Sequence, residues 1–112
     1  MEGDELVRVL TALASPQRLR ILAVLAEGRR YVTELARQVG LSRPLVHAHL
    51  SKLAAAGLVS SETELSDEGH AMRYVSVTPF SLRLTPQVIA AAVATLAAPD
   101  QATSKTDEEN VR

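Results

Sequence analysis

The segment 32–50 restricts the fold more than any other part of the chain, because it has the pattern of two helices joined by a tight turn. Ala36 is small enough to stand where two helices touch, and Gly40 can adopt the positive φ that such a turn requires. Val46 follows at the spacing expected of a buried residue on the second helix. The pattern predicts a helix-turn-helix with apolar contacts from Leu35, Val39, Leu41 and Val46. An ordinary helical hairpin is the alternative.

Residues that start and stop helices divide the rest of the chain. A serine or threonine stands at each expected N-cap, in three cases with a proline in the turn that follows, at Ser15, Thr33, Ser42 and Thr85. Glycine or proline stands at the expected ends, at Gly28, Gly40, Gly57 and Pro99. We therefore expect helices over residues 4–14, 16–27, 34–39, 43–56 and 85–98. The second helix is expected to bury Leu19, Leu22, Ala23 and Ala26.

Two strands are predicted after the helix-turn-helix, at 58–64 and 72–78, on either side of a turn-rich link at 65–70. The expected fold class is mainly α with a small β-hairpin (α+β), in the order four helices, hairpin, helix. We expect one domain over 1–98, with the helix-turn-helix at 33–56, the hairpin at 58–78 and the last helix at 85–98. Residues 99–112 are polar and charged and are expected to form a disordered acidic tail.

The formal net charge of −1 hides a strong asymmetry along the 112 residues. From Leu6 to Ser60, eight basic residues stand against two acidic ones, whereas residues 1–5, 61–70 and 99–112 are acidic. The potential that a polyanion meets is local on the scale of a Debye length, about 10 Å. A basic block between acidic flanks is therefore compatible with a nucleic-acid partner.

The second helix of a helix-turn-helix enters the major groove of DNA with its N-terminal residues. Val46, Leu50 and Leu53 form a stripe toward the core, which leaves Arg43 and His47 on the other side. Arg43 is the best candidate for reading a base, because its fork can pair with guanine O6 and N7. A solvated surface arginine is the alternative. His49 lies on the core side, and we expect it to be packed at the core edge with one hydrogen bond.

Composition argues against other classes of protein. The chain has no cysteine and therefore no thiolate nucleophile, and it has neither a glycine-rich phosphate loop nor paired catalytic groups, so an enzyme is not expected. Aromatic residues are too few and scattered for a platform that stacks single-stranded bases. No apolar run reaches the roughly 18 residues of a membrane span, and the acidic first residues do not resemble a secretory signal. We expect a cytoplasmic protein without a membrane partner.

Most of the chain, from Leu10 to Thr78, resembles the ArsR/SmtB-type bacterial regulators. The similar pieces are LASPQRLRIL at 13–22, ELA at 34–36 with GLS at 40–42, and VHAHLSKL at 46–53 running into AGLV at 56–59. The resemblance implies a homodimeric winged helix-turn-helix that binds double-stranded operator DNA. The hairpin would be the wing, with Arg73 on its returning strand. The predicted DNA contacts are Thr33, Arg37, Ser42, Arg43, Pro44, His47, Ser51, Lys52 and Arg73.

Many members of this family release DNA when a metal binds, but this chain departs from their metal sites. Tyr31 and Thr33 stand where thiolate sensors carry cysteine, and the predicted last helix has neither Asp nor His. A weak alternative is an N/O site for nickel, zinc or cobalt from His70 with Asp67, Glu68 and Glu64. We favour a solvated acidic turn there. No cofactor is required by the sequence, and a metal- or stress-responsive role rests on the resemblance.

The last predicted helix is apolar over most of its circumference and must be covered on more than one side. A second copy of the chain is the natural cover, although packing on its own domain is the alternative. The resemblance places the first helix in the same interface, so the predicted dimer contacts are Leu6, Leu10, Leu13, Val88, Ile89, Ala92, Val93 and Leu96. The acidic wing and the missing metal ligands leave a second hypothesis open. It is a winged-helix subunit whose DNA binding or sensing depends on a separate partner protein.

Overall fold

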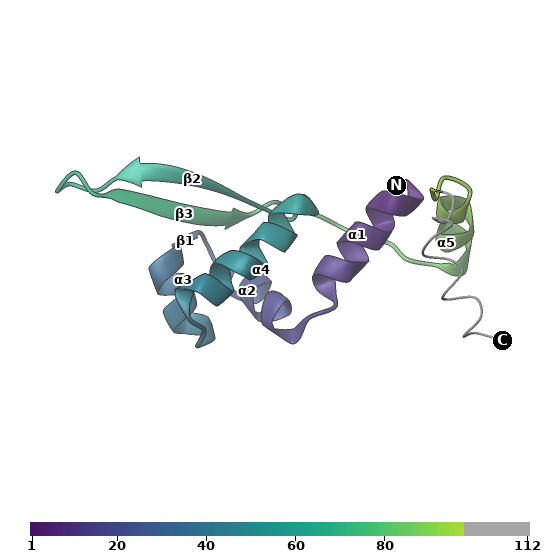
Figure 1. The fold of residues 1–112 in the computed structure, drawn as a ribbon. Helices are drawn as coiled ribbons and strands as arrows, with labels where there is room; N and C mark the ends of the chain where they lie inside the picture. Colours follow the sequence, from purple (N-terminus) through teal and green to yellow (C-terminus); the bar gives the residue numbers. More distant parts are fainter. Residues whose placement is uncertain (98–112) are drawn as a thin grey trace, which may run out of the picture. The chain divides into compact units, whose positions relative to one another are not determined.

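The computed structural model describes residues 1–97, which form five helices and a three-stranded antiparallel sheet (Figure 1). The predicted order of helices and hairpin is confirmed, with one strand more than expected. The expected acidic tail at 99–112 lies outside the described residues. The elements are α1 (Gly3–Leu13), α2 (Pro16–Ala26), β1 (Arg30–Tyr31), α3 (Val32–Val39), α4 (Arg43–Ala55), β2 (Val59–Leu65), β3 (Ala71–Val77) and α5 (Pro86–Val93).

The described residues divide into two compact units. The larger unit is Val7–Arg83 and holds α2, α3, α4 and the whole sheet. The smaller unit combines residues 1–6 with the described residues from Leu84 onward, and it contains α5. Between residues 1 and 97 no single helix is long and apolar enough to cross a membrane, although α1 and α2 together, as a bent pair, reach that length and composition.

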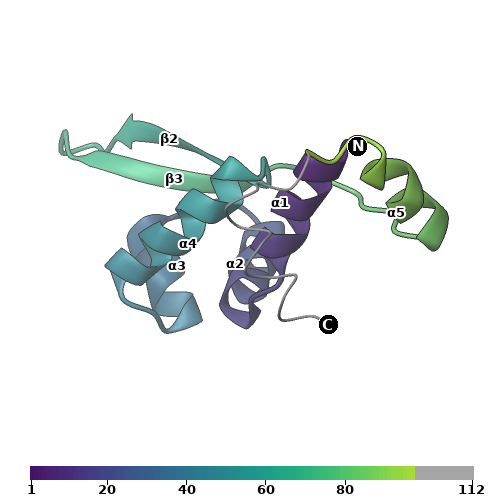
Figure 2. The ribbon, with the colours of Figure 1, turned by 45° about the vertical axis from the view of Figure 1, so that its right-hand side comes forward.

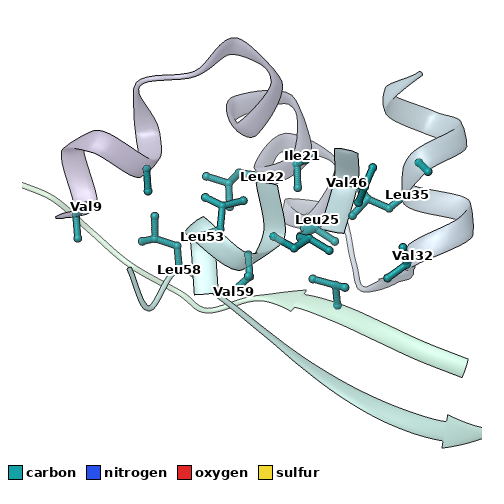
Figure 3. Close-up of a cluster of buried hydrophobic side chains, with 14 residues drawn as sticks. Val9, Ile21, Leu22, Leu25, Val32, Leu35, Val46, Leu53, Leu58 and Val59 are labelled. Atoms are coloured by element: carbon teal, nitrogen blue, oxygen red, sulfur yellow. The ribbon is translucent and has the colours of Figure 1, made fainter. Parts of the chain in front are cut away.

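The core of the larger unit is made of aliphatic side chains that the helices direct onto the sheet (Figure 3). Ile21, Leu35, Val46 and Leu53 are completely buried, and each contributes about 1.5–3 kcal/mol relative to remaining in water. The expected stripe on α2 is wrong except for Leu22. Its buried residues are Ile21, Leu22 and Leu25, whereas Leu19, Ala23 and Ala26 are exposed.

Three of the four predicted N-caps are confirmed by side-chain hydrogen bonds. The hydroxyl oxygens of Ser15, Ser42 and Thr85 each accept a bond from a backbone N–H three residues further on. The prediction for Thr33 is wrong. The N-cap of α3 is Tyr31, whose side chain makes no capping bond, and Thr33 lies inside the helix on an exposed position.

The sheet has the strand order β1-β3-β2, so the returning strand of the hairpin is the central one. We call residues 59–77, comprising β2, β3 and their turn, the wing. Its register pairs Val59 with Val77 and Leu65 with Ala71, and its distal part extends past α3 and α4 (Figures 1 and 2). The unpredicted strand β1 pairs Arg30 with Val75 and Tyr31 with Tyr74. Two residues are too few to produce a periodic signal in the sequence.

Helix α5 ends at Val93, earlier than the predicted end at Ala98, which lies outside the described residues. The chain turns after Val93 because the Thr95 hydroxyl donates to the carbonyl of Ala92 at 3.0 Å and accepts from the backbone N–H of Gly3 at 2.8 Å. Threonine side chains compete in this way with the helical backbone bonds. Gly3 is needed at this contact, since a Cβ there would collide with the carbonyl oxygen of Ala92.

Candidate nucleic-acid interface

The turn between α3 and α4 sets the direction of α4. Gly40 ends α3 in the left-handed conformation at φ 71°, and the backbone N–H of Leu41 donates to the carbonyl of Ala36 at 3.1 Å. Ala36 is buried, as its predicted place between the helices requires. Ser42 then caps α4, and Pro44 occupies its first turn without loss of a backbone bond. These residues fix α4 with its N-terminal turn exposed.

One side of α4 carries the predicted base-reading residues. Val46, Leu50 and Leu53 are buried, whereas Arg43, His47 and the other predicted DNA contacts on this helix are exposed. A shallow hollow is lined by Arg43, Pro44 and His47. The sequence-derived phase of α4 is therefore confirmed, while the role of these side chains in DNA binding stays a prediction.

The wing reaches this same side of α4. The guanidinium Nη1 of Arg73 on β3 lies 3.1 Å from Nδ1 of His47. An arginine has only donors, so Nδ1 of His47 accepts this bond, and the neutral ring then carries its hydrogen on Nε2. The geometry brings a guanidinium and an N–H donor together from two elements. Both side chains are exposed and free to meet phosphates or base edges.

The remaining predicted contacts are exposed but more dispersed. Arg37 forms an ion pair with Glu34 on the same helix, which raises the pKa of Arg37 and lowers the pKa of Glu34. A contact from Arg37 to phosphate therefore requires this pair to open. Lys52 lines a different hollow, together with Arg8 and Thr11 of α1. The structure thus does not bring Lys52 to the hollow at Arg43.

His49 lies at the core edge, as predicted, and within residues 1–97 its ring has one hydrogen-bond partner, Arg18. Nη1 of Arg18 is 3.3 Å from its Nδ1, and Nε of Arg18 also donates to the carbonyl of Ala12 at 2.8 Å. Burial lowers the pKa of His49 first, and the positive charges of Arg18 and Lys52 lower it further. His49 therefore joins α2 to α4 as a neutral ring.

A cluster on the strands of the wing was not found from the sequence. Nη1 of Arg29 lies 2.7 Å from Oε2 of Glu64 and 3.5 Å from Oε1 of Glu62. The Arg29 guanidinium also lies 3.9 Å from the centre of the Tyr74 ring, and Tyr31 meets that ring edge-on at 5.0 Å. The acidic wing is therefore partly neutralised. Only the strand register brings these residues together, and no local pattern signals it.

The weak metal candidates are only partly brought together. Nδ1 of His70 lies 3.7 Å from Oε1 of Glu68, while Glu64 is engaged with Arg29. Across residues 1–97 no three His, Asp or Glu side chains are grouped so that they could hold a metal ion. The donor set present therefore does not fit a metal centre of the family's thiolate or last-helix type.

Comparisons with known proteins agree with this architecture. A family model described as "Bacterial regulatory protein, arsR family" matches residues 15–61. An uncharacterized HTH-type transcriptional regulator, MJ0229 of Methanocaldococcus jannaschii, is 35% identical over 89 residues, which span 80% of this chain and 93% of that protein. A probable mercury resistance operon repressor of Streptomyces lividans is 37% identical over 71 residues, which span 63% of this chain and 54% of the relative.

A solved structure shares the fold. The homodimeric winged helix-turn-helix DNA-binding domain Mb0332 of Mycobacterium bovis, described as a possible ArsR-family transcriptional regulator, matches with a TM-score of 0.61 and 26% identity. The match covers 96% of this chain and 82% of that domain. The α3–turn–α4 segment and the wing therefore correspond to a known DNA-binding architecture.

Proposed function

Because this chain belongs to the ArsR family of bacterial transcriptional regulators, we propose that it binds a palindromic operator as a homodimer and acts in the cytoplasm. A two-fold dimer would place two α4 helices about 34 Å apart, one helical turn of DNA. The homodimeric state of the M. bovis domain supports this arrangement. The exposed apolar residues Ile89 and Val93 on α5 offer a surface for a second copy.

The observation that carries the proposal is the meeting of α4 and the wing at His47 and Arg73. Arg43 stands on the same exposed side of α4 and has no acidic partner among residues 1–97. Its fork is open to a guanine edge, while Arg73 is placed for the backbone beside it. This geometry supports base-specific contacts from α4 and contacts from the wing that position the protein on the DNA backbone.

Selection of bound fragments from genomic DNA tests the proposal and supplies the operator. The recovered fragments should share an inverted repeat. The affinity of one such duplex should fall steeply with salt, with a slope that grows with the number of phosphates contacted. Undetectable affinity for every fragment, or an affinity independent of salt, would contradict the proposal. Binding that appears only when a second protein is added would instead favour the partner-dependent subunit.

Metal-responsive control is the second part of the proposal, supported by the name of the S. lividans relative. The same selection is repeated with nickel, zinc, cobalt and a chelator. A change in operator affinity that the chelator reverses, and that His70→Asn removes, would assign the response to the wing turn. A response that persists in His70→Asn would exclude this turn, and the absence of any response would exclude these three metals as effectors.

A further inference from the structure

The wing has two chemically different faces. Residues paired directly across an antiparallel sheet lie on the same face, so the pairs Tyr31–Tyr74 and Glu62–Tyr74 place these three side chains together. Glu64, two residues beyond Glu62, lies on that face too. The alternate residues of β3, Val75 and Arg73, point the other way. Val75 is buried against the helices.

Arg29 holds the outer face together by three kinds of contact. Its two terminal nitrogens donate to the two oxygens of Glu64, at 2.7 and 3.3 Å, in the paired geometry that a guanidinium fork favours. The same guanidinium covers the Tyr74 ring and approaches Glu62. We call these five residues the wing clamp: Arg29, Tyr31, Glu62, Glu64 and Tyr74. The hydrogen bond from Arg29 lowers the pKa of Glu64, so this carboxylate stays ionised and paired.

The inner face carries the DNA-directed contact. Arg73 is adjacent to Tyr74 on β3, and its guanidinium meets His47 of α4. Whatever holds Tyr74 in place therefore also fixes the strand that presents Arg73. Without Arg29, the carboxylates of Glu62 and Glu64 would be left uncompensated on the wing. Their repulsion of a phosphate falls off over the Debye length, about 10 Å.

We propose that Arg29 is a positioning residue for DNA binding, acting through Glu62, Glu64 and Tyr74 on the outer face of the wing. It offsets the charge of the wing carboxylates and fixes β3 so that Arg73 stays beside His47. Arg29 itself does not contact the DNA. This inference rests on the proposed function and deepens it, because it explains how a wing with several carboxylates can serve a DNA-binding protein.

Direct phosphate contact by Arg29 is the competing explanation. The two explanations predict opposite signs for the coupling between the loss of Arg29 and the neutralisation of Glu62 and Glu64, measured as operator affinity. A directly binding Arg29 would first have to leave Glu64. Glutamine at positions 62 and 64 would then free it, so that its loss costs as much or more in that background. A positioning Arg29 keeps only its contact with Tyr74 once the carboxylates are neutral, because its ion pairs with Glu62 and Glu64 are gone, so that its loss costs less.

The experiment measures operator affinity for four proteins: wild type, Arg29→Gln, Glu62→Gln/Glu64→Gln, and the triple variant. We expect Arg29→Gln to weaken binding about fivefold in the wild-type background and less than about twofold in the neutralised one. Arg20→Gln is the matched control, because it removes an exposed arginine from α2. Its effect should be the same with and without the two glutamates. Arg29→Lys keeps the charge without the fork and should fall between wild type and Arg29→Gln.

A second readout needs no DNA. The chain has two tyrosines and no tryptophan, and both tyrosines belong to the wing clamp. Tyrosine fluorescence of the free protein should therefore change in Arg29→Gln and not in Arg20→Gln, while circular dichroism shows both variants folded. Equal loss of affinity in both glutamate backgrounds, no loss in either, or unchanged fluorescence in Arg29→Gln would overturn the proposal. Failure of the wild type to bind any operator would instead reject the proposed function, and the positioning role with it.

Discussion

Arg43 is exposed on the first turn of α4, where a guanidinium can reach a base edge. Arg43→Ala should weaken operator binding by about 1–3 kcal/mol and relax the preference at one base pair of each half-site. Repeating the fragment selection with the variant measures both effects. Arg43→Lys should keep the salt dependence but lose the preference, because an ammonium cannot pair with O6 and N7 together. A uniform loss over all sequences would show that Arg43 contacts phosphate only.

His49 links stability to pH because burial and nearby cations lower its pKa from the usual 6.5. As the pH falls below about 6.5, His49 becomes protonated in the unfolded chain while it is still neutral in the folded protein. The free energy of unfolding should therefore decrease between pH 7 and pH 5.5. Urea unfolding at the two values measures the difference.

The matched variants for this pH dependence are His49→Asn and His70→Asn. The asparagine carbonyl can still accept the bond from Arg18 but does not titrate, so the difference between the two pH values should shrink in His49→Asn. His70 has a side chain that is 76% exposed, and His70→Asn should keep the wild-type dependence. Equal dependence in all three proteins would rule out His49 as the source.

The helical period of α4 predicted both the place of His49 at the core edge and the exposed place of Arg43, because a helix repeats its faces regularly. Arg29 shows the limit of such reasoning. Nothing within several residues of Arg29 marks it, since its partners Glu64 and Tyr74 come from strands far along the chain. The register that aligns them depends on packing of the sheet against the core, which local pattern does not contain.

Substitutions at Ser42, the N-cap of α4, can separate the effect of this residue on protein stability from its effect on operator binding. Ser42→Ala removes the acceptor for the backbone N–H of Leu45 and should cost about 1 kcal/mol of unfolding free energy. Ser42→Asp keeps an acceptor and favours the helix dipole, so its stability should match the wild type. The added negative charge should nevertheless weaken operator binding. A Ser42→Asp protein that binds as tightly as wild type would place this end of α4 away from DNA.

Helix starts were predictable where a side chain supplies the cap, as at Ser15, Ser42 and Thr85. Helix starts were not predictable where backbone pairing between strands determines the first helical residue. Helix α3 begins at Val32 because β1 holds Tyr31 against Tyr74, a contact that Thr33 could not reveal. The end of α5 was missed for a similar reason, because Thr95 bonds to Gly3 at the opposite end of the chain.

The net charge of −1 describes this molecule poorly, because basic and acidic side chains lie on different faces. Arg43 and Arg73 are presented beside His47, while Glu62 and Glu64 are held on the other face of the wing by Arg29. Since salt screens charges over about 10 Å, DNA responds to the nearer surface more than to the sum. The division of the sequence into basic and acidic blocks predicted the asymmetry, and the strand register decides which side of the wing each charge occupies.

The last prediction concerns the proposed dimer. Two α4 helices bind a palindromic operator more tightly than one only if the dimer joins them. Val93 on α5 is 56% exposed, and Val93→Asp should place a charge in the proposed interface and yield monomers by sedimentation. Affinity for the full palindrome should then fall to that for a half-site, because the second contact is no longer intramolecular. Gln87→Asp adds the same charge at an exposed polar position of α5 and should leave the dimer intact. A Val93→Asp protein that remains dimeric would place the interface away from this face of α5.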